Sequence, residues 1–127
     1  MPDEIPPVGF GPDVYEFVTP ATGTPINENT AFTVSVIAPT RDADKYQLQY
    51  GVIPDDPMAP IVIIILLNPP TTSDPDGTYQ GHQTYTYSVT APSVTADAAL
   101  QLQFMYRVTT LDPFEAKKNR TVIVKNV

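Results

Sequence analysis

The chain has 127 residues, enough for one domain with its own hydrophobic core. It contains no cysteine, which excludes disulfide bonds, thiolate metal sites and a cysteine nucleophile. Its formal net charge of −7 argues against a surface that follows nucleic-acid phosphates, so no nucleic-acid partner is expected. The longest apolar run has seven residues, far fewer than the roughly 20 that cross a bilayer, so no membrane partner is expected either.

The first segment in chain order, residues 1–12, reads MPDEIPPVGFGP. Its prolines and glycines prevent regular secondary structure, whereas Ile5, Val8 and Phe10 supply apolar anchors. Acids and prolines stand where a secretion signal needs positive charge and an apolar run, so we expect a chain made without a signal or one whose signal was removed. The sequence thus predicts an extended arm over 1–12, followed by a β-domain over 13–127.

The rest of the chain is divided by prolines, of which the whole chain has fifteen, and long helices are nearly excluded. Between them, apolar and polar residues alternate with a period of two, the pattern of a strand with one buried face. Strands are predicted over 14–18, 32–36, 46–52, 61–67, 84–89, 100–108 and 121–125. Seven short strands separated by turn clusters favour an antiparallel β-sandwich. A small closed barrel is the alternative, and the prolines favour the sandwich.

The apolar positions of these alternating strands predict which residues form the core. The residues that we expect two facing sheets to share are Phe32, Val34, Leu48, Tyr50, Leu102 and Phe104. Most tyrosines follow the same phase, which favours sheet packing over a platform for stacking sugar rings. These tyrosines are Tyr46, Tyr50, Tyr85, Tyr87 and Tyr106. They are therefore predicted as core or sheet-face residues rather than as a carbohydrate site.

The run IVIIILL at 61–67 breaks the alternation, because seven apolar residues leave neither face of the strand polar. Such a strand has to be covered on both faces, either by its own chain or by a neighbouring molecule, and both alternatives remain open. We therefore predict a protein-contact surface formed by apolar residues of the arm or of this run. The candidate contact residues are Ile5, Val8, Phe10, Ile61, Ile63, Ile64 and Ile65.

Few residues of this sequence have the chemistry of a polar site. His82 is the only histidine, and without a second metal ligand or a nearby nucleophile it is predicted to be a surface residue at a strand entry. The cluster Lys117, Lys118 and Arg120 is predicted to be a solvated turn before the last strand rather than a basic binding patch.

Calcium needs carboxylate oxygens that converge from loops, and several aspartates fall in predicted turns. They are Asp42, Asp44, Asp55, Asp56, Asp74 and Asp76. Aspartate also caps turns through its own side chain, and this explanation is favoured over a metal site. We therefore predict no catalytic centre, no metal site and no cofactor.

Residues 85–108, YTYSVTAPSVTADAALQLQFMYRV, run from an apolar alternation into a small-residue corner, Asp97-Ala98-Ala99, and then into a long alternating strand. This segment resembles the E strand, E–F corner and F strand of immunoglobulin-like and fibronectin type III-like modules. The chain lacks the cysteine pair and tryptophan of antibody domains, and Leu100 or Leu102 stands where a corner tyrosine is expected. The resemblance therefore implies the architecture of an immunoglobulin-like sandwich but not an antibody-type domain.

Small, acidic, cysteine-free sandwiches of this kind resemble the decoration and fibre proteins of tailed-phage particles. The resemblance implies a non-enzymatic structural or binding subunit on the virion surface, oligomeric in its working state, that contacts a capsid shell or like subunits. The alternative is a subunit of an extracellular pilus-like filament or cell-surface adhesin, in which one chain completes the sheet of the next. A carbohydrate-binding module or small hydrolase is a third hypothesis.

Overall fold

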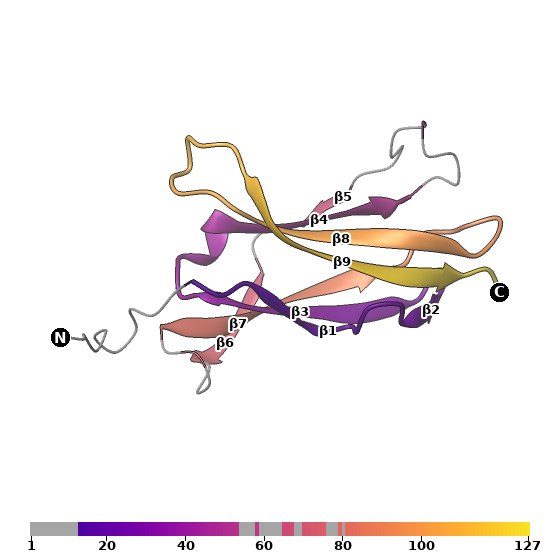
Figure 1. The fold of residues 1–127 in the computed structure, drawn as a ribbon, viewed down its shortest axis with the longest axis horizontal. Coiled ribbons are helices and arrows are strands. Elements are labelled where there is room, and N and C mark those ends of the chain that lie inside the picture. The colour runs from indigo at the N-terminus through magenta and orange to yellow at the C-terminus, as the bar shows by residue number, and fades with distance from the viewer. Residues whose placement is uncertain (1–12, 54–57, 59–64, 68–69, 76–78, 80) are drawn as a thin grey trace.

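The computed structural model describes residues 13–53, 58, 65–67, 70–75, 79 and 81–127 (Figure 1). In this part of the chain the fold is almost entirely β, with one 3₁₀ turn, η1, at Ala43–Lys45. A four-stranded sheet has the order β1 (Glu16–Thr19), β3 (Ala31–Pro39), β7 (His82–Thr90), β6 (Thr71–Pro75). A five-stranded sheet has the order β2 (Pro25–Asn27), β9 (Glu115–Lys125), β8 (Ala98–Tyr106), β4 (Tyr46–Val52), β5 (Ile65–Leu67).

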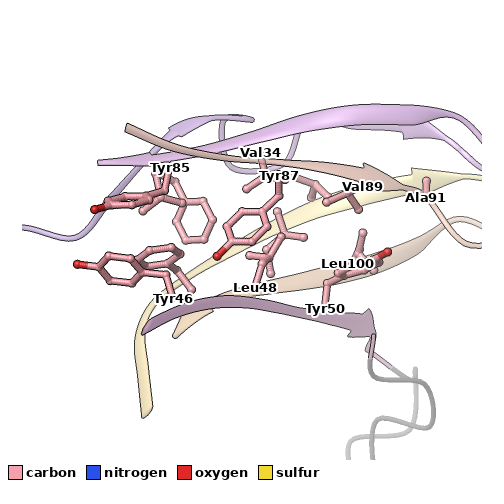
Figure 2. Close-up of a cluster of buried hydrophobic side chains, with 14 of the residues drawn as sticks. Val34, Tyr46, Leu48, Tyr50, Tyr85, Tyr87, Val89, Ala91 and Leu100 are labelled. Atoms are coloured by element: carbon pink, nitrogen blue, oxygen red, sulfur yellow. The ribbon is translucent and has the colours of Figure 1, made fainter. Parts of the chain in front are cut away.

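The two sheets face each other across a hydrophobic core, as in a β-sandwich (Figures 1 and 2). Adjacent strands are antiparallel, except that β2 runs parallel to β9. The chain passes from the first sheet to the second between β1 and β2. Gly23 forms part of this crossover, with a φ of 78° that favours glycine, and its N–H donates to the carbonyl of Thr121 in β9 at 2.9 Å.

The predicted core is confirmed except at one residue. Val34, Leu48, Tyr50, Leu102 and Phe104 are buried, whereas Phe32 is partly buried and packs against the cluster. Cross-strand pairing explains the match, because each inward side chain of one strand lies opposite an inward side chain of the next. The inward pairs are Leu48 with Phe104, Tyr50 with Leu102, Val34 with Tyr87 and Val36 with Tyr85.

Each of the seven predicted strands overlaps a strand of the structure, but their limits differ. The prediction for 100–108 was too long, since β8 ends at Tyr106 and Val108 is exposed. The predicted turn at Lys117, Lys118 and Arg120 is wrong, because all three residues lie within β9. Only the last three residues of the run 61–67 are described, as β5. Two strands, β2 and β6, were not predicted.

Candidate protein-contact site

The loop over residues 107–114 joins β8 to β9 at one end of the domain (Figure 1). Arg107 fixes its start, because the backbone N–H donates to the carbonyl of Lys45 at 3.0 Å. The guanidinium donates to the carbonyls of Asp44 and Thr110, both at 3.3 Å, and lies 4.4 Å from the centroid of the Phe114 ring. One side chain thus ties both ends of the loop to η1.

The tip of the loop is held by Asp112. Its carboxylate accepts hydrogen bonds from the Thr109 backbone N–H at 3.1 Å and from the Thr109 hydroxyl at 3.2 Å. The Asp112 N–H donates to the carbonyl of Thr109 at 3.1 Å, and the Leu111 N–H donates to the Thr109 Oγ1 at 3.2 Å. These four bonds close the turn.

This turn directs apolar side chains into solvent. Leu111 is 94% exposed and Val108 is 63% exposed. Beside them lies a hollow of about 270 Å³, lined by Tyr106, Arg107, Val108, Asp112, Pro113, Glu115 and Lys117. The lining combines two basic with two acidic side chains, so it is polar without a dominant charge. Exposed apolar residues beside such a hollow make this loop a candidate protein-contact site.

Tyr15 extends the site toward the N-terminal segment. Its ring lies 6.3 Å from that of Phe104, and the Lys117 amine lies 5.7 Å from the Tyr15 ring centroid. Burial, together with the nearby Asp13 carboxylate, raises the pKa of the Tyr15 hydroxyl. The phenol therefore stays protonated at neutral pH, so its chemistry here is that of a packing residue and hydrogen-bond donor.

The structure corrects the prediction for His82, which is only 3% exposed and is not a surface residue. Its position at the start of a strand, β7, is as predicted. The His82 Nε2 accepts a hydrogen bond from the backbone N–H of Val14 at 3.0 Å, and the Tyr79 ring lies 5.8 Å from the imidazole. Sequence offered no signal for this role, because the acceptor and donor are 68 positions apart.

The aspartates do not gather into a site in the part of the chain that the structure describes. Asp42 and Asp44 lie at the start of η1, where the Lys45 N–H donates to the carbonyl of Asp42. Asp74 lies in β6 and not in a loop, so that prediction is wrong. Asp55, Asp56 and Asp76 lie outside the described residues. Within the described ranges no three His, Asp or Glu side chains are close enough to hold a metal ion.

Arg120 has a structural role instead of the predicted solvated one. Its guanidinium donates to the carbonyls of Pro20 at 2.8 Å and Phe17 at 3.4 Å, and lies 5.3 Å from the Phe17 ring centroid. Arg120 in β9 therefore fastens the crossover between β1 and β2 to the second sheet.

Most predicted contact residues cannot be placed. Ile5, Val8, Phe10, Ile61, Ile63 and Ile64 lie outside the described residues. Ile65 is in β5, where its backbone pairs with Tyr50, and Leu67 in the same strand is partly buried against the core. The chain itself therefore covers Leu67. The exposed Leu111 was missed, although an apolar residue directly before Asp112-Pro113 was a possible signal for an exposed turn.

Comparison with known proteins gives no family: no protein-family model matches this chain, and no curated protein matches its sequence. Among the described residues there is no helix with the length and apolar character of a membrane span.

Proposed function

We propose that this domain is immunoglobulin-like. The strand orders β1-β3-β7-β6 and β2-β9-β8-β4-β5 support this proposal. They correspond to the A-B-E-D and G-F-C arrangement of immunoglobulin sandwiches, with β5 added beside C and β2 added beside G. An architecture of this kind serves many functions, so the function has to be argued from the site.

We further propose that the chain is a non-enzymatic structural or binding subunit, and that the 107–114 loop is a contact surface. The observation that carries this proposal is Leu111, which is 94% exposed on a turn held by its own hydrogen bonds. Exposed apolar surface costs about 25 cal/mol per Å² relative to burial, so burial of Leu111 against a partner would favour binding. Because the turn is already ordered, binding loses little conformational entropy.

As its setting we propose the surface of a virion, where a capsid shell or like subunits are the partner, on the resemblance to phage decoration and fibre proteins. A subunit of an extracellular filament or adhesin is the alternative. Mass spectrometry of purified virus particles from the source of this sequence distinguishes the two. The virion proposal expects the chain in the particles at a fixed copy number, and its absence from them contradicts that proposal.

Substitution of the loop tip tests the contact surface. If like subunits are the partner, light scattering over a concentration series will show assembly of the unmodified chain, and Leu111→Ser will shift it to higher concentration. Val127→Ser is a matched control, since Val127 is also exposed, at 78%, but lies at the C-terminus. Equal effects of the two substitutions would contradict a contact at the loop. A chain that stays monomeric throughout would instead exclude like subunits as the partner.

The absence of a catalytic or metal role is also part of this proposal. We expect EDTA to leave the melting temperature unchanged, because within the described residues no three His, Asp or Glu side chains are close enough to hold a metal ion. Differential scanning fluorimetry with and without EDTA measures this. A clear drop that calcium reverses would contradict the proposal and would return Asp42 and Asp44, or Asp74 and Asp76, as ligand candidates.

A further inference from the structure

The N-terminal segment is attached to the domain by a hydrogen bond that depends on the protonation state of one side chain. The Val14 backbone N–H donates to the His82 Nε2 at 3.0 Å, across 68 positions of sequence. Val14 is the second residue that the structure describes, so this bond holds the start of the domain, residues 13–15, which we call the N-terminal segment.

An imidazole nitrogen accepts a hydrogen bond only when it carries no proton. If the His82 Nε2 takes up a proton, its N–H meets the Val14 N–H, and the bond is replaced by repulsion between two donors. The charged imidazolium would also occupy a position that is 3% exposed, where water cannot solvate it well. Protonation of His82 and attachment of Val14 therefore exclude each other.

We propose that His82 is a pH-sensitive latch that holds the N-terminal segment on β7 at neutral pH and releases it on acidification. Histidine side chains ordinarily titrate near pH 6.5, the range in which acidic compartments differ from neutral ones. Release would free Tyr15, whose ring packs against Phe104. The inference stands on the Val14–His82 bond and does not depend on the proposed function.

A pH experiment has to distinguish the titration of His82 from that of other titratable groups nearby. Tyr79 is in ring contact with the imidazole, and its hydroxyl donates to the Glu16 carboxylate at 3.2 Å. The Thr40 N–H donates to the carbonyl of Gly81, the residue before His82, at 2.7 Å. The end of β3, which Arg41 follows closely, therefore lies beside the start of β7. The titratable and charged groups on the elements around His82 are Asp13, Glu16, Arg41, Asp74 and Tyr79. Carboxylates ordinarily titrate near pH 4, below the range of the latch.

Amide hydrogen exchange in the full chain, read by NMR, tests the latch at Val14. After correction for intrinsic exchange rates, we expect the protection of the Val14 amide to fall about tenfold per pH unit below the midpoint, because opening takes up one proton. The amide of Val34, in the centre of β3, should keep its protection over the same range. Constant protection of Val14 between about pH 7.5 and pH 5 overturns the proposal, as does an equal loss at Val34, which reports general unfolding.

Two variants make the test specific. His82→Gln retains an acceptor oxygen that does not titrate in this range, so the protection of Val14 should become independent of pH. Tyr79→Phe removes the bond to Glu16 but leaves the imidazole, so the pH dependence should persist. A pH dependence that survives in His82→Gln, or disappears in Tyr79→Phe, overturns the latch. If His82→Gln does not fold, the imidazole resonances of the unmodified chain decide, since the imidazole must take up its proton only as Val14 is released, with a midpoint below the pH at which the Val14 protection begins to fall.

Discussion

The two ends of the core are built from different chemistry (Figure 2). Near the 107–114 loop the core is aromatic: the ring centroids of Tyr46 and Phe104 are 4.9 Å apart and those of Tyr46 and Tyr85 are 4.5 Å apart. Toward the opposite end the buried residues are mainly aliphatic, among them Val89, Ala91, Leu100, Val122 and Val124. The aromatic end carries the hydroxyls of Tyr46, Tyr85 and Tyr87 into the core, whereas the aliphatic end holds Tyr50, so the aromatic end needs more polar partners.

Those partners come from the backbone at the end of β3 and directly after it. The Tyr46 hydroxyl donates to the carbonyl of Pro39, and the Tyr85 hydroxyl accepts from the Arg41 N–H at 2.9 Å. The Tyr87 hydroxyl is buried without a hydrogen-bond partner in the described structure. Burial raises the pKa of Tyr46 and of Tyr87, so both remain protonated donors at neutral pH. The hydroxyls of Tyr46 and Tyr85 thus have hydrogen-bond partners, whereas that of Tyr87 has none. Removal of a paired hydroxyl should therefore cost more stability than removal of the unpaired one.

The largest effect should come from removal of the ring at the centre of the aromatic end. Phe104→Ala should lower the free energy of unfolding by about 3–5 kcal/mol, because Phe104 contacts four other rings and leaves a cavity. Leu100→Ala at the aliphatic end is the matched change and should cost about 2–5 kcal/mol. Urea unfolding measures both. A loss below about 1 kcal/mol for Phe104→Ala would show that this ring is not central to the core.

Removal of single hydroxyls sharpens the contrast within the aromatic end. Tyr85→Phe should cost about 1–3 kcal/mol, because it leaves the Arg41 N–H without its acceptor. Tyr87→Phe should be neutral or stabilising, since the hydroxyl that it removes is buried and unpaired. The same unfolding experiment compares the pair. Equal losses would mean that the hydroxyl of Tyr87 has a partner, such as a buried water.

A smaller effect should follow from substitution of Arg107, which holds the 107–114 loop at the surface of the aromatic end. Arg107→Lys keeps the charge but loses the planar group that stacks on Phe114 and reaches two carbonyls. We expect a loss of about 1 kcal/mol and faster amide exchange at Leu111. An unchanged exchange rate at Leu111 would show that Asp112 alone keeps the turn rigid.

The smallest effect should come from the surface of the aliphatic end. Hydrogen bonds from the Lys125 amine and the Asn126 N–H lower the pKa of Asp97, so its carboxylate stabilises the fold above the unfolded pKa of about 3.9. That contribution is lost as the pH falls through the lowered pKa. Asp97→Asn should therefore reduce the melting temperature slightly at neutral pH and not at about pH 2. A drop of equal size at both pH values would exclude the ionic origin of the effect.

Alternation made the long strands predictable, because each buries one face and exposes the other. The short strands lack that signal: β2 has three residues, and β6 is a polar run that begins after a proline. The pattern also failed at His82 and Arg120, two polar side chains whose partners are backbone groups 68 and 100 positions away. Leu111 was missed because exposure of one apolar residue depends on the turn around it. Sequence alone therefore predicts core residues better than long-range polar contacts.

The parallel pairing of β2 with β9 has a mechanical consequence. The described chain begins beside the 107–114 loop, where Val14 meets His82, and leaves the domain at the opposite end after β9 (Figure 1). A pulling force between these two ends runs along the strands. It loads the pairs Pro25 with Ile123, Ile26 with Val124 and Asn27 with Lys125 together in shear, instead of peeling them apart one at a time. Under tension the domain should therefore yield abruptly at a high force rather than unravel gradually.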